Sequence, residues 1–263
     1  MKRLVIRPGA LGDCILALPA MEHLASTCET EIWAPSAVVP LIKFSSAVRS
    51  LASTGIDMVG LDGISTPENF IERVRSFDSI VSWYGTGRPE FRCALTSLVL
   101  NCEFHPALPP IESCEHAVDF FARQVGGPVG LVPRISISSD RKRGSIVIHP
   151  FSGSARKNWP LANYRHVAAH LLQPAEWTAG PEEHLPEAHR FDSTADLASW
   201  LAGARVYIGN DSGVTHLAAA LGIPVIAIFR STRPEIWAPR GPNVSVLIDP
   251  SVDEVLARLA LLA

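Results

Sequence analysis

The residues best suited to chemistry lie in one stretch, with the letters VYIGNDSGVTHLAAALGIPVIAIF at positions 206–229. A short β-type run is followed by the turn-forming letters GNDSG, and then by an Ala/Leu-rich helix expected over 215–221. The polar letters therefore come where a strand ends and a helix begins. At such a place, free backbone N–H groups and the positive end of the helix dipole suit an anion such as a diphosphate.

The individual side chains of this stretch also have a plainer interpretation. Asp211 and Ser212 are common helix N-caps, and either one alone would more often be only that. Their concentration with Gly213, Thr215 and His216 favours an anion site.

A second polar loop, with the letters PFSGSARKNWP, follows a strand predicted at 145–149. Its Ser-Gly-Ser turn ends at Ser154, and small residues of this kind let backbone N–H groups point at an oxyanion. Arg156 and Lys157 come next, and a lysine ammonium is a point charge suited to a phosphate. A solvated surface pair is the alternative for these two cations.

Carboxylates occupy two further loop positions. Asp13 follows a glycine-bearing loop at the start of the first helix, where it could accept a proton from a hydroxyl or serve only as a helix cap. Glu182 and Glu183 follow a strand predicted at 176–179, and either could hydrogen-bond a ribose diol. Surface glutamates are common, which is the alternative for both.

The composition is typical of a globular protein with one large or two modest domains. The chain has 263 residues, 47% hydrophobic and 19% charged, and a net charge of −3, which argues against a nucleic-acid binder. Its five cysteines form no Cys-x-x-Cys pair, which favours free thiols in a reducing compartment. No apolar run reaches the roughly 18 residues of a membrane span, so any membrane contact would be peripheral.

Several common motifs of metal sites and of bound cofactors are absent from the sequence. The sequence lacks an Asp-x-Asp pair, a calcium-loop run of oxygen ligands, a Walker A motif and a Gly-x-Gly-x-x-Gly motif. We therefore predict no metal site and no bound cofactor.

Strands and helices alternate in two similar halves, which predicts an α/β fold with parallel, doubly wound sheets. In the first half we expect strands at 4–6, 31–34, 58–61 and 79–83, and helices at 36–44 and 67–77, after a first helix that Pro19 should kink. In the second half we expect strands at 145–149, 176–179, 206–208, 225–229 and 244–248, and helices at 161–172, 193–201, 215–221 and 252–262.

The polar stretch 138–144 has no periodicity and is the predicted linker between domains 1–139 and 145–263. Each half starts with a short apolar strand that runs into a polar loop. We expect those loops to face each other across a cleft at the carboxyl ends of the sheets.

Four segments together resemble the bacterial heptosyltransferases of glycosyltransferase family 9. They are IRPGALGDCILALPA at 6–20, VIHPFSGSARKNWPL at 147–161, IGNDSGVTHLAAALGIPVIAIF at 208–229 and STRPEIWAPRG at 231–241. They occur in the family's order and account for about a quarter of the chain.

The resemblance implies a GT-B fold of two Rossmann-like domains, the first for an acceptor and the second for a nucleotide sugar, usually ADP-heptose. It also implies inverting, metal-independent transfer of the sugar to a hydroxyl of the lipopolysaccharide inner core or a similar glycan. The reaction would then take place in the cytoplasm, at the inner face of the inner membrane.

Carried over by position, Asp13 would be the general base and Lys157 would hold the donor phosphates. Glu183 or Glu182 would contact the ribose. The diphosphate loop would comprise Asp211, Ser212, Gly213 and His216, with the N–H groups at Gly213 and Val214 stabilising the leaving charge.

The sequence departs from the family between Glu183 and the helix expected at 193–201. Only the letters HLPEAHRFD, residues 184–192, remain where the family usually has a helix and a strand. Because that edge helps to hold the nucleoside, two alternatives stay open. The chain could be a degenerate member that binds nucleotide sugars or acts as a scaffold, or a transferase that uses an acceptor other than lipopolysaccharide.

Overall fold

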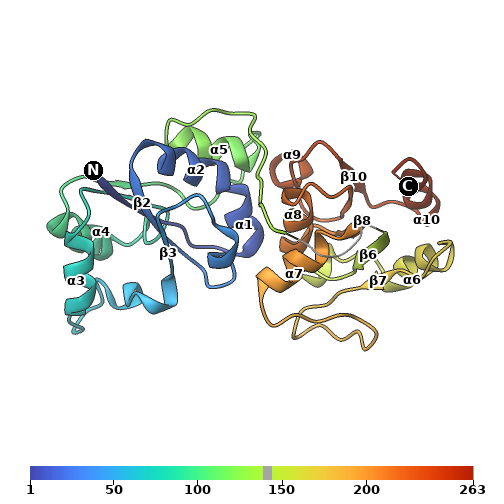
Figure 1. The fold of residues 1–263 in the computed structure, drawn as a ribbon. Helices are drawn as coiled ribbons and strands as arrows, with labels where there is room; N and C mark the ends of the chain where they lie inside the picture. The colour runs from blue at the N-terminus through green and yellow to red at the C-terminus, as the bar shows by residue number, and fades with distance from the viewer. Residues whose placement is uncertain (139–143, 263) are drawn as a thin grey trace. The chain divides into compact units, whose positions relative to one another are not determined.

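The structure is a computed structural model that describes residues 1–138 and 144–262. The chain divides into two compact units, Met1–Ser113 with Ala117–Leu131, and Cys114–His116 with Val132–Ala263. Each unit is an α/β structure built on a parallel sheet, which confirms the predicted fold class (Figure 1). The predicted linker at 138–144 falls mainly on residues 139–143, outside the described residues, so that boundary stays a prediction.

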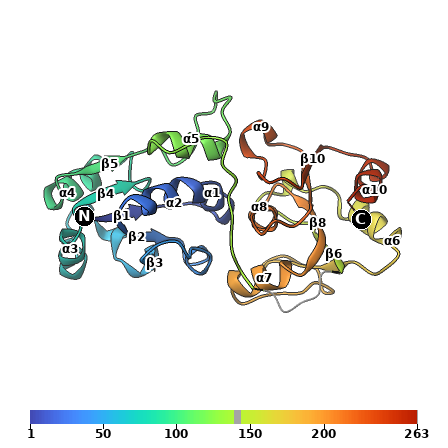
Figure 2. The same cartoon turned by 45° about the horizontal axis from the view of Figure 1, so that its top comes forward.

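In the first unit the described residues form a five-stranded sheet in the order β3-β2-β1-β4-β5, with all pairs parallel. Figure 2 shows β1, β2 and β4 side by side. The strands are β1 (Lys2–Ile6), β2 (Glu29–Ala34), β3 (Ala47–Ser50), β4 (Ser79–Ser82) and β5 (Cys102–Phe104). The helices are α1 (Leu11–Leu16), α2 (Leu18–Thr27), α3 (Glu68–Arg75), α4 (Pro89–Leu98) and α5 (Ala117–Gln124), with 3-10 turns η1 (Val39–Leu41), η2 (Leu51–Ser53) and η3 (Ile56–Met58).

Side-chain alternation along the strands builds the core of this unit. Leu4 and Ile6 of β1 pack with Trp33, Phe70 and Phe91 on the face that α3 and α4 cover. The strand period of two sends the intervening side chains to the opposite face. There α2 and α5 pack against each other.

The second unit has its own five-stranded parallel sheet among the described residues, in the order β10-β9-β8-β6-β7. The strands are β6 (Ser145–His149), β7 (Glu176–Trp177), β8 (Ala204–Asn210), β9 (Val225–Phe229) and β10 (Val244–Ile248). The helices are α6 (Leu161–Ala169), α7 (Thr194–Leu201), α8 (Gly213–Ala220), α9 (Pro234–Trp237) and α10 (Val252–Ala260), with the 3-10 turn η4 (Ala155–Lys157). The helices α6 and α10 pack against each other over one apolar face of the sheet.

The strand order places the functional loops of the second unit. The strands β6 and β8 are parallel neighbours in the sheet, with His149 opposite Gly209. From this pair the sheet extends in opposite directions, through β7 on one side and through β9 and β10 on the other. Loops at the carboxyl ends of two such strands form the usual ligand crevice of an open parallel sheet. The loops 150–160 and 211–213 therefore converge at one edge.

Two of the predicted elements are wrong. The helix expected at 36–44 is only the 3-10 turn η1, since Pro40 lacks an N–H donor and its ring opposes a longer helix. The strand expected at 58–61 is a turn, where Gly60 has a φ of +71° and lies against the backbone of α4. The short edge strand β3 takes the place of that strand beside β2.

The interruption predicted at Pro19 is confirmed, because α1 ends at Leu16 and α2 begins at Leu18. The helix expected at 215–221 begins two residues earlier, at Gly213, since Ser212 is its N-cap. This earlier start places both Gly213 and Val214 in the first helical turn.

Candidate functional site

The N-terminus of α8 has the features of an anion-binding site. Ser212 caps the helix by accepting a hydrogen bond from the Thr215 amide at 3.3 Å. The amides of Gly213 and Val214 lie in the first turn, where an α-helix offers no internal carbonyl to them. These two N–H groups and the helix dipole thus favour a negatively charged ligand.

Buried polar contacts below α8 hold its first turn in place. The Thr215 hydroxyl is fully buried and lies 3.1 Å from the Ser212 hydroxyl and 3.2 Å from the Tyr207 hydroxyl. It also donates to the carbonyl of Asn210. Because burial raises the pKa of the Tyr207 phenol, this group stays protonated and keeps its hydrogen bond.

Lys157 reaches this helix terminus from the loop after β6. Its Nζ donates to Asp211 Oδ2 at 2.7 Å, and Asp211 immediately precedes the cap residue of α8. The lysine side chain is 31% exposed and the aspartate side chain 6%, so the ammonium remains accessible while its partner is buried. The positive charge and the first-turn amides of α8 therefore lie at the same edge of the sheet.

Asp211 collects further donors in addition to Lys157. Its Oδ2 accepts a hydrogen bond from the Thr232 hydroxyl at 2.7 Å, and His216 Nε2 lies 3.7 Å from Oδ1. Although burial opposes ionisation, the adjacent His216 ring and the hydrogen bonds from Lys157 and Thr232 lower the pKa of Asp211 to about 2. An ionised carboxylate offers no donor to a phosphate. The side chain of Asp211 is thus placed to position Lys157 and His216.

We expect Asp211 to make the free energy of unfolding depend on pH. Its pKa is about 2 in the folded chain and about 3.8 ordinarily, so its stabilising effect is present above the unfolded value and lost as the pH falls towards 2. At about 1.4 kcal/mol for each pKa unit, the effect amounts to about 2 kcal/mol. Urea unfolding of the wild type and of Asp211→Asn between pH 7 and pH 3 should show their difference shrinking with acid. A difference that stays constant over this range would contradict the prediction.

Asn210 fixes the loop that carries Lys157. Its Oδ1 accepts hydrogen bonds from the Trp159 amide at 2.8 Å and from the Tyr164 hydroxyl at 2.9 Å. Trp159 is also held by its indole N–H, which donates to the carbonyl of Pro250 at 2.9 Å. The buried end of β8 thereby sets the path of the chain just after Lys157.

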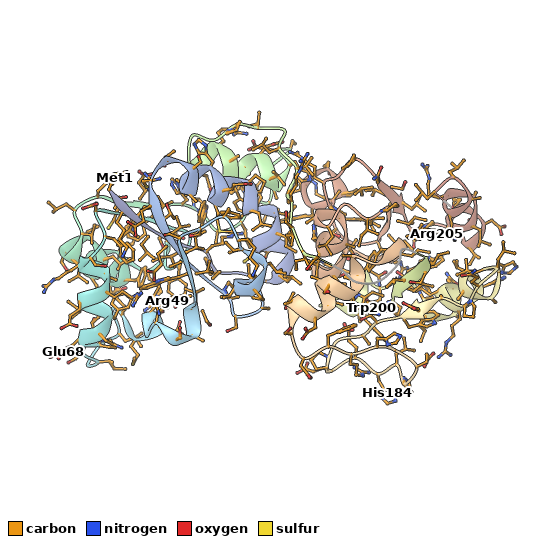
Figure 3. The ribbon with its side chains drawn as sticks, in the orientation of Figure 1. Met1, Arg49, Glu68, His184, Trp200 and Arg205 are labelled. Atoms are coloured by element: carbon orange, nitrogen blue, oxygen red, sulfur yellow. The ribbon has the colours of Figure 1, made fainter. Side chains whose placement is uncertain are left out.

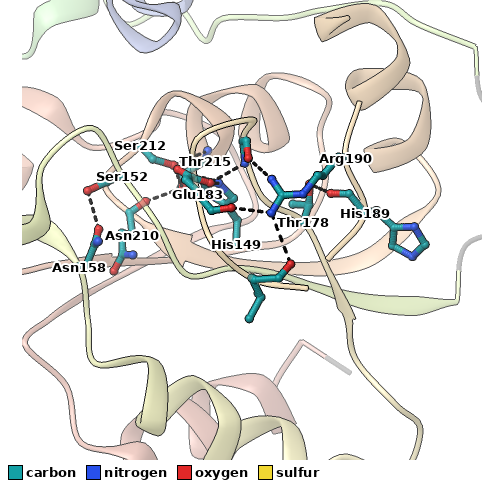
Figure 4. Close-up of polar contacts among 12 residues, drawn as sticks. His149, Ser152, Asn158, Thr178, Glu183, His189, Arg190, Asn210, Ser212 and Thr215 are labelled. Carbon is teal, nitrogen blue, oxygen red and sulfur yellow. Dashed lines mark hydrogen bonds and ion pairs between the residues drawn. The ribbon is translucent and has the colours of Figure 1, made fainter. Parts of the chain in front are cut away.

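A pocket of about 440 Å³ opens between the loop after β6 and the loop after β7. Residues 152–155 line one side and residues 180–183 the other. Glu183 Oε2 accepts from His149 Nε2 at 3.1 Å and from the Gly180 amide at 2.6 Å (Figure 4). Although burial opposes ionisation, these two donors hold the pKa of Glu183 below its ordinary value. A fixed, charged acceptor therefore stands in the wall of the pocket.

In the first unit, Asp13 occupies the third position of α1. Its Oδ2 accepts a hydrogen bond from the Ala10 amide at 3.1 Å, so the side chain is a helix cap. It is nevertheless half-buried, and the capping bond engages only one of its two carboxylate oxygens. The buried Arg7 donates to the backbone carbonyl of Asp13 at 3.0 Å and thus fixes the start of this helix.

We expect Gly9→Ala to disturb Asp13. Gly9 has a φ of +121°, which L residues rarely adopt, and an added Cβ would lie 3.2 Å from Asp13 Cβ and 3.3 Å from its Oδ2. Such backbone strain costs about 1–3 kcal/mol, which thermal unfolding would detect. Gly87→Ala is the matched control, because no atom of the described residues lies within 4 Å of its added Cβ. Equal melting temperatures for the two variants would contradict the prediction.

Not all the predicted site residues contact one another. The structure brings Lys157, Asp211 and His216 together, and it places Ser154, Glu182 and Glu183 around the pocket. Arg156 is exposed. Sequence reasoning missed Thr232, although it follows β9 closely and falls in the segment 231–241 that carried the resemblance.

His166, in the last turn of α6, and His170, the C-cap residue of that helix, form a His-x-x-x-His pair. Their ring centroids are 4.8 Å apart, and His170 Nδ1 contacts the carbonyl of His166 at 2.9 Å. Both side chains are exposed. Within residues 1–138 and 144–262, no group of three or more His, Cys, Asp or Glu side chains is arranged to hold a metal ion. In the same part of the chain, no helix has both the length and the apolar character that crossing a membrane requires.

Comparison with known proteins identifies the family. The family model "Glycosyltransferase family 9 (heptosyltransferase)" matches residues 92–253, which is more than half of the chain. The chain belongs to glycosyltransferase family 9. The resemblance drawn from the four sequence segments is thereby confirmed.

Individual relatives and solved structures show how far the similarity extends. Lipopolysaccharide heptosyltransferase 1 of Pseudomonas aeruginosa is 31% identical over 93 residues, which span 30% of this chain and only 26% of that protein. The structure of E. coli ADP-heptose lps heptosyltransferase II matches with a TM-score of 0.75 and 16% identity, covering 100% of this chain and 98% of that one. The E. coli heptosyltransferase WaaC with ADP matches with a TM-score of 0.73 and 18% identity, covering 100% of both chains. At these identities the structural matches establish a shared fold, that of the GT-B type.

Proposed function

We propose that this family 9 member transfers a heptose, or a related sugar, from ADP-heptose to a glycan hydroxyl. The acceptor would be the lipopolysaccharide inner core or a similar glycan at the cytoplasmic surface of the inner membrane. The observation that carries the proposal is the convergence of the Lys157 ammonium and the first-turn amides of α8 at the carboxyl edge of β6 and β8. Family membership supports the same reaction class.

The ammonium and the amides are suited to stabilise the leaving group of the reaction. As the bond to ADP breaks, the sugar becomes oxocarbenium-like and negative charge grows on the diphosphate. Lys157 and the amides of Gly213 and Val214 would stabilise that charge without a metal, because they are already held in place before the reaction. Asp211 would keep the ammonium oriented until the donor binds.

Asp13 is the proposed general base. A carboxylate near an acceptor hydroxyl can take its proton as the oxygen attacks, and attack opposite the leaving group inverts the sugar's configuration. The capping bond to the Ala10 amide engages one oxygen of Asp13 and leaves the other for the hydroxyl. In the second unit, Glu183 and its neighbour Glu182 are the proposed contacts for the ribose, since both line the pocket.

A transfer assay tests the proposal directly. The full chain is incubated with ADP-heptose, GDP- and UDP-sugars and a lipopolysaccharide core acceptor, with and without EDTA. We expect transfer from ADP-heptose that EDTA does not reduce. Transfer only from another donor would change the proposed nucleotide, and loss of transfer on chelation would overturn metal independence.

The shortened segment 184–192 favours a second candidate, a member that has lost catalysis and binds nucleotide sugars as a scaffold. Calorimetric titration with ADP, GDP and UDP, combined with transfer assays on several acceptors, separates this candidate from a transferase that uses another acceptor. Tight ADP binding without turnover on any glycan would favour the binding protein. Turnover on a protein or another surface glycan would instead change only the acceptor.

A further inference from the structure

The chain makes a closed excursion after β7, visible in Figure 1 as the long loop below α7. It leaves the sheet at Thr178 and returns at His189, where the two residues form a single parallel bridge. The His189 amide donates to the carbonyl of Trp177 at 2.8 Å, and the Ala179 amide donates to that of His189 at 3.2 Å. Beyond β7, this edge of the sheet is thus continued by a single bridging pair.

Aromatic packing anchors the returning chain on α7. The rings of His189 and Phe191 lie 5.1 and 5.2 Å, centroid to centroid, from the ring of Trp200. Figure 3 labels Trp200 on α7 and His184 at the outer turn of the excursion. Leu185, the residue after His184, is buried and is the apolar anchor of the loop.

One side chain bridges the excursion from within. The guanidinium of Arg190 donates to the carbonyls of Gly180, Glu183 and Leu185, the second at 2.5 Å and the third, more weakly, at 3.5 Å (Figure 4). Arginine presents several N–H donors in a planar fork, so it can hold carbonyls that point from different turns of a loop. Because this loop is short and has no β-ladder of backbone hydrogen bonds, such contacts determine much of its shape.

Two of these carbonyls belong to residues that line the 440 Å³ pocket, Gly180 and Glu183. The same two residues are joined by the hydrogen bond from the Gly180 amide to Glu183 Oε2. Arg190 therefore holds, from outside the pocket, the turn that presents the Glu183 carboxylate inside it.

We propose that Arg190 is a positioning residue that fixes the wall formed by residues 180–183 and thereby sets the pocket's affinity for the nucleoside part of the donor. The inference rests on the proposed function for its ligand. The other part of the inference, that Arg190 fixes the wall, does not depend on any ligand.

The experiment compares Arg190→Gln, Arg190→Lys and the wild-type full chain. The control is Arg258→Gln, which changes an exposed arginine on α10. Hydrogen exchange of the peptide over 178–190 reports on the wall, and calorimetry with ADP and with inorganic pyrophosphate separates the nucleoside from the phosphates. Thermal unfolding verifies that each variant is folded.

For Arg190→Gln we expect faster exchange within 180–188 and about tenfold weaker ADP binding, as expected from the loss of a few hydrogen bonds to a charged group. Pyrophosphate binding should not change, because Lys157 and α8 are untouched. Arg190→Lys keeps the charge but loses the fork, so it should recover only part of the affinity. The control should match the wild type.

Unchanged exchange in Arg190→Gln would overturn the inference whatever the ligand. Equal losses for ADP and pyrophosphate would overturn it as well, since they would indicate a general disturbance. If the wild-type chain bound neither ligand, the proposed function would fail together with the claim on affinity. The exchange result would still decide whether Arg190 fixes the wall.

Discussion

Lys157→Ala is expected to lower the rate of sugar transfer by about 10²–10³-fold, the usual result of removing one preorganised charge-stabilising group. The ammonium lies at the N-terminus of α8, where the charge of the leaving diphosphate would develop. Because the contact strengthens as the bond to the sugar breaks, kcat should fall more than the affinity for ADP. Steady-state transfer kinetics and calorimetry with ADP measure the two effects separately.

The fold should survive the loss of Lys157. Asp211 keeps its contacts with Thr232 and His216, so its buried carboxylate is not left without donors. Lys43→Ala, which removes an exposed lysine of the first unit, is the matched control and should behave like the wild type. Turnover near the wild-type level in folded Lys157→Ala would remove this residue from the mechanism.

Asp13→Asn is expected to reduce transfer by about 10²–10⁴-fold, the usual contribution of general acid–base catalysis. The amide oxygen of asparagine can still accept the hydrogen bond from the Ala10 amide, so the cap of α1 should remain and the melting temperature should change little. What is lost is the ability to take a proton. Nucleotide binding, which involves the other unit, should be unaffected.

A second carboxylate of the same unit provides the control for Asp13. Asp62→Asn changes an exposed side chain and should transfer the sugar at the wild-type rate. Transfer near the wild-type rate in folded Asp13→Asn would assign the proton to another group.

Local patterns were sufficient for much of this molecule. The turn letters before an Ala/Leu-rich run predicted a polar helix N-terminus at α8, since capping depends on residues only three apart. The alternation of strands and helices, which is also visible in short stretches of sequence, predicted two doubly wound α/β units. Local reasoning failed at residues 36–44, where an apolar run suggested a helix and Pro40 prevents one.

The sequence by itself determined the α/β class, the family and the positions of the loops that carry the candidate groups. Only the tertiary structure decided which of those groups meet. Lys157 and Asp211 are 54 residues apart, and His149 and Glu183 are 34 residues apart. The physical reason is that a parallel sheet brings the carboxyl ends of distant strands to one edge, and strand order, which the sequence pattern does not encode locally, selects the neighbours. Arg190 acts within a short loop, yet its partners became evident only once the return of the chain at His189 was known.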